Sequence, residues 1–447
     1  MSNNLNLNSK KYDFIFRSPE KILPITFFIL CFIGSLLLAI PFSNVGKINF
    51  LDSVFTAVSA VCVTGLSVFD VGSNLSLFGQ LILIILIQLG GLGIMSISSI
   101  VFLLLGKRMS LSYAKTARNI FDVESNLEIK KSLFLIFKFT FWTEFLGALI
   151  LSYCFIIEEN NIFCGLKLGI FTAISAFCNA GFFLKSTNLI SYNTSPIILY
   201  TISFLIILGG ISPAICAYLP NLLKKKKIPA MGVIVFYTTM VLLFVGTIFF
   251  LISEYNGALQ GLNFMDKFNN AWFQSVTTRT AGFNSVDLSN INTVSYILFI
   301  FLMIVGGSPG GTAGGIKTVA LGISYITLYN VITGKKNIVR NRLIPSDVLQ
   351  KIVTLIVFYL SILLLIILML LTTQSLSNRN LIFEAVSAMG TVGLSLGITS
   401  SLDEVGKVII IIAMFLGRVF PVTLLCYINS KSVDSNIEYP DAKISLT

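Results

Sequence analysis

The chain has 447 residues, of which 55% are hydrophobic and only 11% are charged, and its formal net charge is +11. Soluble domains carry roughly 25% charged residues, so this composition excludes an ordinary soluble domain and favours a membrane protein with several spans. Histidine, the commonest general base and zinc ligand, is absent, which argues against an enzyme active site. The seven cysteines lack the spacing of a metal cluster or a disulfide framework.

Eight apolar stretches are near or above the roughly 20 residues that a spanning helix needs. In chain order they occupy about 22–41, 75–105, 132–157, 194–222, 230–253, 294–333, 348–373 and 404–429. The polar segment before the first stretch does not resemble a cleavable signal peptide. The sequence therefore predicts an all-α polytopic membrane protein with eight transmembrane helices.

Basic residues gather before the first predicted span and in every second connection after it. If the spans alternate in direction, all these segments lie on one side of the membrane, and basic loops stay cytoplasmic. We therefore expect a multi-pass protein with both termini in the cytoplasm, and the positive charge does not indicate nucleic-acid binding. The basic positions are Lys10, Lys11, Arg17 and Lys21; Lys107, Arg108, Lys115, Arg118, Lys130 and Lys131; Lys224 to Lys227; and Lys335, Lys336, Arg340, Arg342 and Lys351.

A short phrase that ends in glycine occurs once between the two spans of each predicted pair. Each copy is about a dozen residues long, too short to cross a bilayer, and is typical of a re-entrant helix. The pattern predicts four span–re-entrant pore helix–span repeats, arranged pseudo-fourfold around one ion pore. The copies run from Phe55 to Gly65, Phe171 to Gly181, Trp272 to Gly282 and Phe383 to Gly393, with glycines 116, 101 and 111 residues apart.

These features divide the chain into six parts. Cytoplasmic ends are expected at 1–21 and 430–447. The four pore repeats between them occupy 22–105, 106–222 with a basic cytoplasmic linker, 223–333 with an intramembrane loop at 306–318, and 334–429.

The residues before each glycine indicate a selectivity filter made of backbone carbonyls. Inward-pointing carbonyls can replace the hydration shell of a cation, and glycine supplies the positive φ that such a backbone needs. The positions carry neither a carboxylate ring nor a basic ring, which favours a weakly hydrated monovalent cation such as K⁺. The predicted filter residues are Val63, Thr64 and Gly65; Asn179, Ala180 and Gly181; Thr280, Ala281 and Gly282; and Thr391, Val392 and Gly393.

The sixth apolar stretch contains a second glycine-rich segment. Each glycine in a helix costs about 1 kcal/mol and proline about 3 kcal/mol, so the helix is expected to break around a loop within the membrane. A phosphate-binding loop is rejected because Ile316 separates Gly315 from Lys317. The candidate gate residues of this loop are Gly306, Gly307, Gly310, Gly311, Gly314, Gly315 and Lys317.

The charged residues Arg418, Arg279 and Glu144 also fall within the predicted membrane region. Arg418 is expected to face a cavity or a partner, either as a structural hydrogen-bond donor to the loop carbonyls or as a cationic barrier beside the loop. The gate would then come from the third and fourth repeats. Arg279 is expected to point behind the third filter, and Glu144 to pair with a basic group.

Matching glycines mark the second span of each repeat. The pairs Gly90-Gly91, Gly209-Gly210, Gly306-Gly307 and Gly417-Arg418 follow the phrase glycines by 25, 28, 24 and 24 residues. Small residues at such positions are typical of close helix packing.

The phrases Val63-Thr-Gly-Leu-Ser67, Thr278-Arg-Thr-Ala-Gly-Phe283 and Thr391-Val-Gly-Leu-Ser395 resemble the filter loops of the Ktr/Trk/HKT superfamily of K⁺ transporters. The eight spans are most similar to the membrane subunit of bacterial Ktr systems. Four filter glycines in that superfamily imply K⁺ and Rb⁺ selectivity, and the family also has an arginine at the place of Arg418.

The resemblance implies K⁺ uptake across the plasma membrane, with Na⁺ dependence left open and no cofactor in this chain. It also implies a homodimer and a cytosolic ring of KtrA-like Rossmann subunits that bind ATP, ADP or NAD. The alternative from the residues is a Na⁺- or H⁺-coupled secondary transporter of a small solute. Such transporters usually carry intramembrane carboxylates, which are few here.

Overall fold

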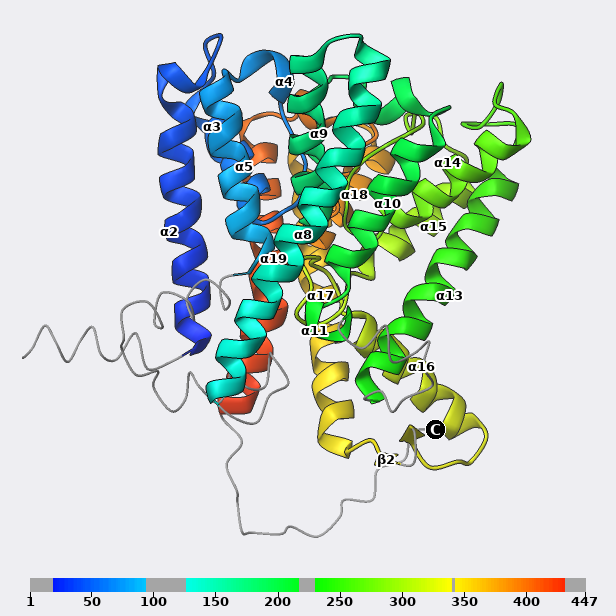
Figure 1. Cartoon of the computed structure of the whole chain (residues 1–447). Helices are drawn as coiled ribbons and strands as arrows, with labels where there is room; N and C mark the ends of the chain where they lie inside the picture. Colours follow the sequence, from blue (N-terminus) through cyan, green and yellow to red (C-terminus); the bar gives the residue numbers. More distant parts are fainter. Residues whose placement is uncertain (1–18, 94–125, 217–229, 340–341, 431–447) are drawn as a thin grey trace, which may run out of the picture.

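The computed structural model describes residues 19–93, 126–216, 230–339 and 342–430. The predicted cytoplasmic ends, apart from 19–21 and 430, lie outside this part, and so do Arg340 and the basic residues at 107–118 and 224–227. The described chain is mostly helical (Figure 1). Its strands β1 (Ile338–Val339) and β2 (Arg342–Leu343) form one short antiparallel hairpin.

Each predicted repeat contains four or five helical segments of the described chain. The first repeat contains α2 (Pro19–Ala39), η1 (Pro41–Ser43), α3 (Phe50–Val61), α4 (Val71–Asn74) and α5 (Leu77–Gly91). The second contains α8 (Asn126–Glu159), α9 (Ile162–Phe177), η2 (Asn188–Tyr192), α10 (Pro196–Gly210) and α11 (Pro213–Cys216). The third contains α13 (Ala230–Ser253), α14 (Phe264–Thr277), α15 (Thr293–Ile304) and α16 (Thr318–Ile332). The fourth contains α17 (Ser346–Thr373), α18 (Asn378–Gly390), η3 (Thr399–Ser401) and α19 (Glu404–Ser430).

Four helical segments in the described chain are long and apolar enough to cross a membrane, namely Leu133–Glu159, Ala230–Ser253, Ser346–Thr373 and Glu404–Leu425. The other four predicted spans contain shorter apolar helices, so eight crossings stay a prediction. The predicted interruption of the sixth stretch is confirmed, because α15 ends at Ile304 and α16 begins at Thr318.

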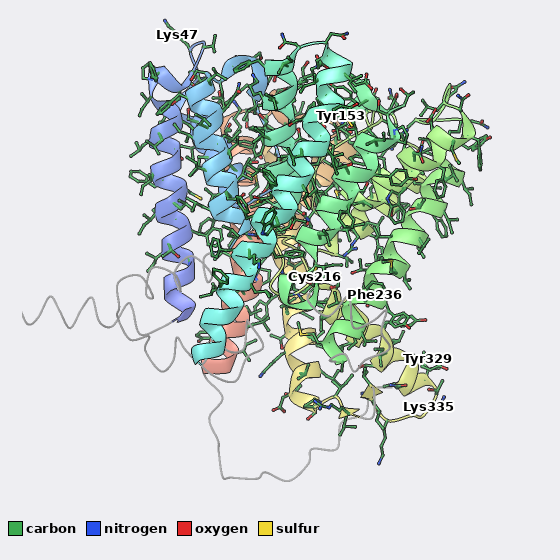
Figure 2. All side chains as sticks on the ribbon, viewed as in Figure 1. Lys47, Tyr153, Cys216, Phe236, Tyr329 and Lys335 are labelled. Carbon is green, nitrogen blue, oxygen red and sulfur yellow. The ribbon has the colours of Figure 1, made fainter. Side chains whose placement is uncertain are left out.

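The outer helices expose large apolar side chains. On α8 these include Phe141, Trp142 and Tyr153, all more than half exposed. Exposed apolar surface of this extent marks contact with another apolar medium, and lipid hydrocarbon fits helices of this length. Figure 2 shows Lys47, which precedes α3, at one end of the molecule, and Tyr329 and Lys335 at the opposite end.

The four repeats pack in a closed order. We call the helices of the four phrases, α3, α9, α14 and α18, the re-entrant helices, after the sequence prediction. The long helix after each of them packs against the re-entrant helix of the next repeat, in the pairs α5–α9, α10–α14, α15–α18 and α19–α3. Polar contacts reinforce three of these junctions: Tyr200 donates to Asn269 at 2.8 Å, Tyr296 donates to the Arg379 carbonyl at 2.8 Å, and Lys407 pairs with Asp52 at 2.7 Å. The last pair joins the fourth repeat to the first.

Glycines in three of the second spans allow the predicted close packing. A Cβ on Gly90, Gly209 or Gly417 would lie less than 3.0 Å from the carbonyl oxygen of Val61, Phe177 or Met389, respectively. Each of these carbonyls lies four residues before the phrase glycine of its repeat. These glycines therefore let a membrane helix touch the end of the re-entrant helix of its own repeat.

We expect Gly209→Ala to lower the thermal unfolding midpoint in detergent by several degrees. The new methyl group would overlap the Phe177 carbonyl, and overpacking of this kind costs about 1–3 kcal/mol. Gly46→Ala is the control, because a Cβ there meets no atom within 4 Å. Equal midpoints for the two variants would contradict this packing role.

Candidate functional site: a ring of four glycine loops

The four re-entrant helices end in loops with the same backbone pattern. We call residues 63–65, 179–181, 280–282 and 391–393 the glycine loops. In each loop the first and third residues have positive φ. The φ values are 57° and 93° for Val63 and Gly65, 59° and 70° for Asn179 and Gly181, 71° and 79° for Thr280 and Gly282, and 52° and 91° for Thr391 and Gly393.

Positive φ is uncommon for a residue with a side chain and is a genuine outlier for a β-branched one. Val63, Thr280 and Thr391 are β-branched, so three of the loops hold strained residues at the same position. Such strain persists only where the surrounding structure imposes it, and it gathers at functional sites. In each loop, the middle residue lies between two residues in the left-handed conformation. The peptide planes of the loop are therefore turned differently from those of a regular helix or strand.

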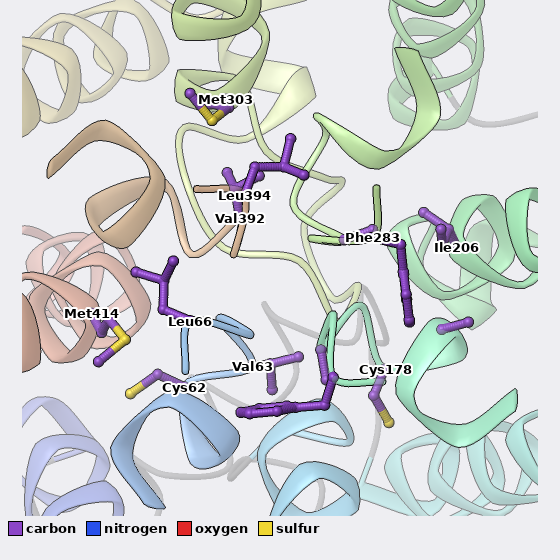
Figure 3. Packing of buried hydrophobic residues seen from close by; sticks show 14 of the residues in the cluster. Cys62, Val63, Leu66, Cys178, Ile206, Phe283, Met303, Val392, Leu394 and Met414 are labelled. Carbon is purple, nitrogen blue, oxygen red and sulfur yellow. The ribbon is translucent and has the colours of Figure 1, made fainter. Parts of the chain in front are cut away.

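The four glycines touch in the order of the chain and close into a ring. A Cβ on Gly65 would lie less than 3.0 Å from the Ala180 carbonyl oxygen, and one on Gly181 would meet the Ala281 carbonyl oxygen in the same way. The same contact joins Gly282 to the Val392 carbonyl and Gly393 to the Thr64 carbonyl. Figure 3 shows Val63, Cys178, Phe283 and Val392 around this central region.

Hydroxyl groups from the re-entrant helices hold the loops. Ser59 Oγ accepts from the Gly65 N–H and Ser387 Oγ accepts from the Gly393 N–H, both at 3.1 Å. Ser175 Oγ donates to the Phe182 carbonyl at 2.8 Å, and Thr277 Oγ1 accepts from the Phe283 N–H at 2.8 Å. These residues are not among the predicted site residues, although every phrase carries a hydroxyl five or six positions before its glycine.

Below the ring, the segment between α15 and α16 folds back on itself. A parallel bridge pairs Val305 with Ile316, and the Gly306 N–H donates to the Ile316 carbonyl at 2.9 Å. The Thr318 N–H donates to the Gly307 carbonyl at 3.0 Å. We call residues 305–317 the intramembrane loop.

The intramembrane loop docks on the end of α10, in the second repeat. The N–H groups of Ser308 and Thr312 donate to the carbonyls of Gly210 and Gly209, at 2.9 and 3.0 Å. Ser308 Oγ in turn accepts from the Ser212 N–H at 2.7 Å. The last carbonyls of a helix have no partner within it, and here the loop supplies one. The sequence did not indicate this contact with the second repeat.

The predicted gate glycines occupy tight places in this segment, with one exception. A Cβ on Gly306, Gly307, Gly311 or Gly314 would come within 3.0 Å of another atom. Gly315 has a φ of 65°, whereas Gly310 is exposed and has a φ of 77°. Lys317 precedes α16, and its ammonium group donates to the Ala313 carbonyl at 2.7 Å.

Arg418 of α19 joins the intramembrane loop to the first repeat. Its guanidinium group donates to the Thr312 carbonyl and, at 2.8 Å, to the Gly90 carbonyl. The predicted hydrogen bond to a loop carbonyl is therefore present. The role of Arg418 as a barrier to ions is a separate proposal.

The other two charged residues, Arg279 and Glu144, contact uncharged groups in the described chain. The guanidinium group of Arg279 approaches the intramembrane loop, with Nη2 3.5 Å from the Gly306 carbonyl oxygen, and its place behind the third filter stays a prediction. The basic partner predicted for Glu144 is wrong. In the described chain, its carboxyl group contacts Gln88 Nε2 at 3.1 Å and Cys178 Sγ at 3.9 Å. An amide and a thiol at this helix crossing supply the donors without a second charge.

A ring of strained, glycine-ended loops among apolar helices is typical of a cation-conducting membrane protein. The model of the TrkH family, described as a cation transport protein, matches residues 2–437. The chain therefore belongs to the TrkH family of cation transport proteins, which are transporters and not enzymes.

Several individual proteins are similar over almost their whole length. The potassium/sodium uptake protein NtpJ of Enterococcus hirae is 35% identical and is aligned over 96% of this chain and 97% of its own. The Ktr system potassium uptake protein B of Bacillus subtilis is also 35% identical, over 96% of both chains. The crystal structure of the potassium transporter TrkH from Vibrio parahaemolyticus has a TM-score of 0.70 at 19% identity and covers 92% of this chain and 84% of that one.

We expect Ser59→Ala to loosen the first glycine loop, because the Gly65 N–H loses its acceptor. An unpaired donor costs about 1–3 kcal/mol, so amide hydrogen exchange in a peptide covering residues 62–66 should be about tenfold faster. Ser361→Ala is the control, since that exposed hydroxyl bonds within its own helix. Unchanged exchange in Ser59→Ala would argue against the bracing role.

Proposed function

We propose that this protein carries K⁺, and also Rb⁺, into the cell through the ring of glycine loops. The observation that carries the proposal is the closed contact of four loops with one backbone pattern. Carbonyls from four chain segments at one level can replace the hydration shell of a weakly hydrated cation. The names of the relatives, a potassium/sodium uptake protein and a Ktr potassium uptake protein, support K⁺ as the substrate.

The membrane potential is sufficient to drive this uptake. An inward negative potential is worth about 2.3 kcal/mol per charge for each 100 mV, so K⁺ can accumulate without ATP chemistry in this chain. The proposal includes eight crossings, pseudo-fourfold repeats and cytoplasmic termini in the plasma membrane. It leaves open whether Na⁺ activates transport.

We further propose that the intramembrane loop is the gate and that Arg418 holds it closed. The loop spans from the third repeat to α10, and Arg418 ties it to α5 through Gly90. A guanidinium group near the path would also repel a cation. Release of these bonds would let the loop move.

Regulation would come from outside the chain. We propose a homodimer that works with a cytosolic ring of KtrA-like Rossmann subunits, which would bind ATP, ADP or NAD. The support is the similarity to a potassium uptake protein of a Ktr system, since a protein named as one part of a system works with further components. The basic connections predicted to face the cytoplasm offer charge for docking.

Gly65→Ser should reduce the preference for K⁺ over Na⁺ by about an order of magnitude, which corresponds to roughly 1.4 kcal/mol. The new Cβ would overlap the Ala180 carbonyl and would be strained at a φ of 93°, so the carbonyls of two loops must move. The measurement is K⁺, Rb⁺ and Na⁺ flux into liposomes. Equal K⁺ and Na⁺ flux in the native protein would refute the filter.

Arg418→Ala should raise K⁺ flux several-fold, because hydrogen bonds to a charged group are worth about 1.5–3 kcal/mol each and two of them are lost. Lys47→Ala is the control for loss of a positive charge, at an exposed position that precedes α3. A folded Arg418→Ala protein with native flux would contradict the gate role.

A further inference from the structure

A fully buried carboxylate stands behind the fourth glycine loop. Glu384 belongs to α18, and its exposed fraction is 0%. It is the second residue of the fourth phrase, where the other three phrases have Thr56, Thr172 and Phe273. The fourth re-entrant helix is thus the one that carries a carboxyl group at this position.

Hydroxyl groups from the chain that leaves the glycine loop hold both carboxylate oxygens. Ser395 Oγ donates to Glu384 Oε2 at 2.8 Å, and Thr399 Oγ1 donates to Oε1. Ser395 follows Gly393 by two residues and also accepts from the Gly397 N–H at 3.0 Å. Glu384 therefore links α18 to the segment immediately after the ring.

In the described chain, no other repeat bonds a carboxyl group of its re-entrant helix to the segment after its glycine. Thr56 Oγ1 donates at 2.8 Å to the Asp52 carbonyl, within its own helix. In the third repeat, a single and longer contact joins Gln274 Nε2 to Ser285 Oγ at 3.4 Å. The fourth repeat has two hydrogen bonds from one carboxyl group to the segment after its glycine loop.

A buried carboxylate is costly unless it is paired and hydrogen-bonded. The ion pairs of the described chain that the structure places near the re-entrant helices are Lys185–Glu159 and Lys407–Asp52, and neither involves Glu384. Its contacts are the two hydroxyls instead. Burial of this carboxyl group is costly, and the group lies beside the ring that is proposed to select the ion. We therefore expect Glu384 to help hold the geometry of that ring.

We propose that Glu384 is a positioning residue for cation selectivity, which holds the fourth glycine loop in place through Ser395 and Thr399. This inference rests on the proposed function of the glycine loops as a filter. Carbonyls distinguish K⁺ from Na⁺ through their number, spacing and field strength, all of which depend on a loop that keeps its place. Glu384 acts through the loop and does not touch the ion.

The test measures the ratio of K⁺ to Na⁺ flux in liposomes for the full chain and four variants. Glu384→Ala and Ser395→Ala remove the link from either end and should each lower the ratio about tenfold, as expected when a buried hydrogen-bonding group loses its partner. Glu384→Gln keeps the shape and can bond both hydroxyls, so it should restore most of the ratio. Thr56→Ala, the matched position in the first repeat, should leave the ratio unchanged.

The outcomes separate this inference from the function on which it rests. A native K⁺ preference that persists in Glu384→Ala would overturn the inference alone, and so would a Glu384→Gln ratio as low as that of Glu384→Ala. If Glu384→Ala fails to fold, a native flux ratio in Ser395→Ala would overturn the inference instead. Native protein without K⁺ preference would overturn both proposals.

Discussion

The four glycines approach one another so closely that no side chain fits between them, and the rest of the fold serves that contact. Each glycine abuts a carbonyl oxygen of the next loop, and the fourth meets the first. Such an approach requires re-entrant helices that end at the same level. The helix after each glycine loop must also contact the end of the re-entrant helix, and Gly90, Gly209 and Gly417 allow this contact. Apolar outer faces then leave the whole arrangement to be solvated by lipid.

The four repeats share one loop pattern in the ring, but they differ in their contacts with the intramembrane loop. The third repeat breaks its helix and folds the intramembrane loop, the second repeat receives that loop on α10, and the fourth and first repeats join it through Arg418 and Gly90. The intramembrane loop, expected to form a gate from two repeats, thus has contacts that involve all four.

Repetition explains what could be predicted from the sequence. The glycine phrase occurs four times, so its register alone placed the re-entrant helices and their loops, and the glycines of 306–315 located the break between α15 and α16. The partners of single residues could not be found in this way. Glu144 meets Gln88 and Cys178, and Ser308 meets α10, because helix crossings bring together residues far apart in the chain. The hydroxyl residue that is repeated in the phrases, such as Ser59 or Ser387, could have been recognised from the sequence as a contact of the glycine loop.

The central claim is that a cation sits on the axis of the glycine ring. An experimental structure determined in Rb⁺, with the anomalous signal used to locate the ion, tests it most directly. If the glycine loops form a filter, a Rb⁺ peak is expected at the centre of the ring, surrounded by carbonyl oxygens of the four loops. A map with well-ordered glycine loops and no Rb⁺ peak between them would contradict it.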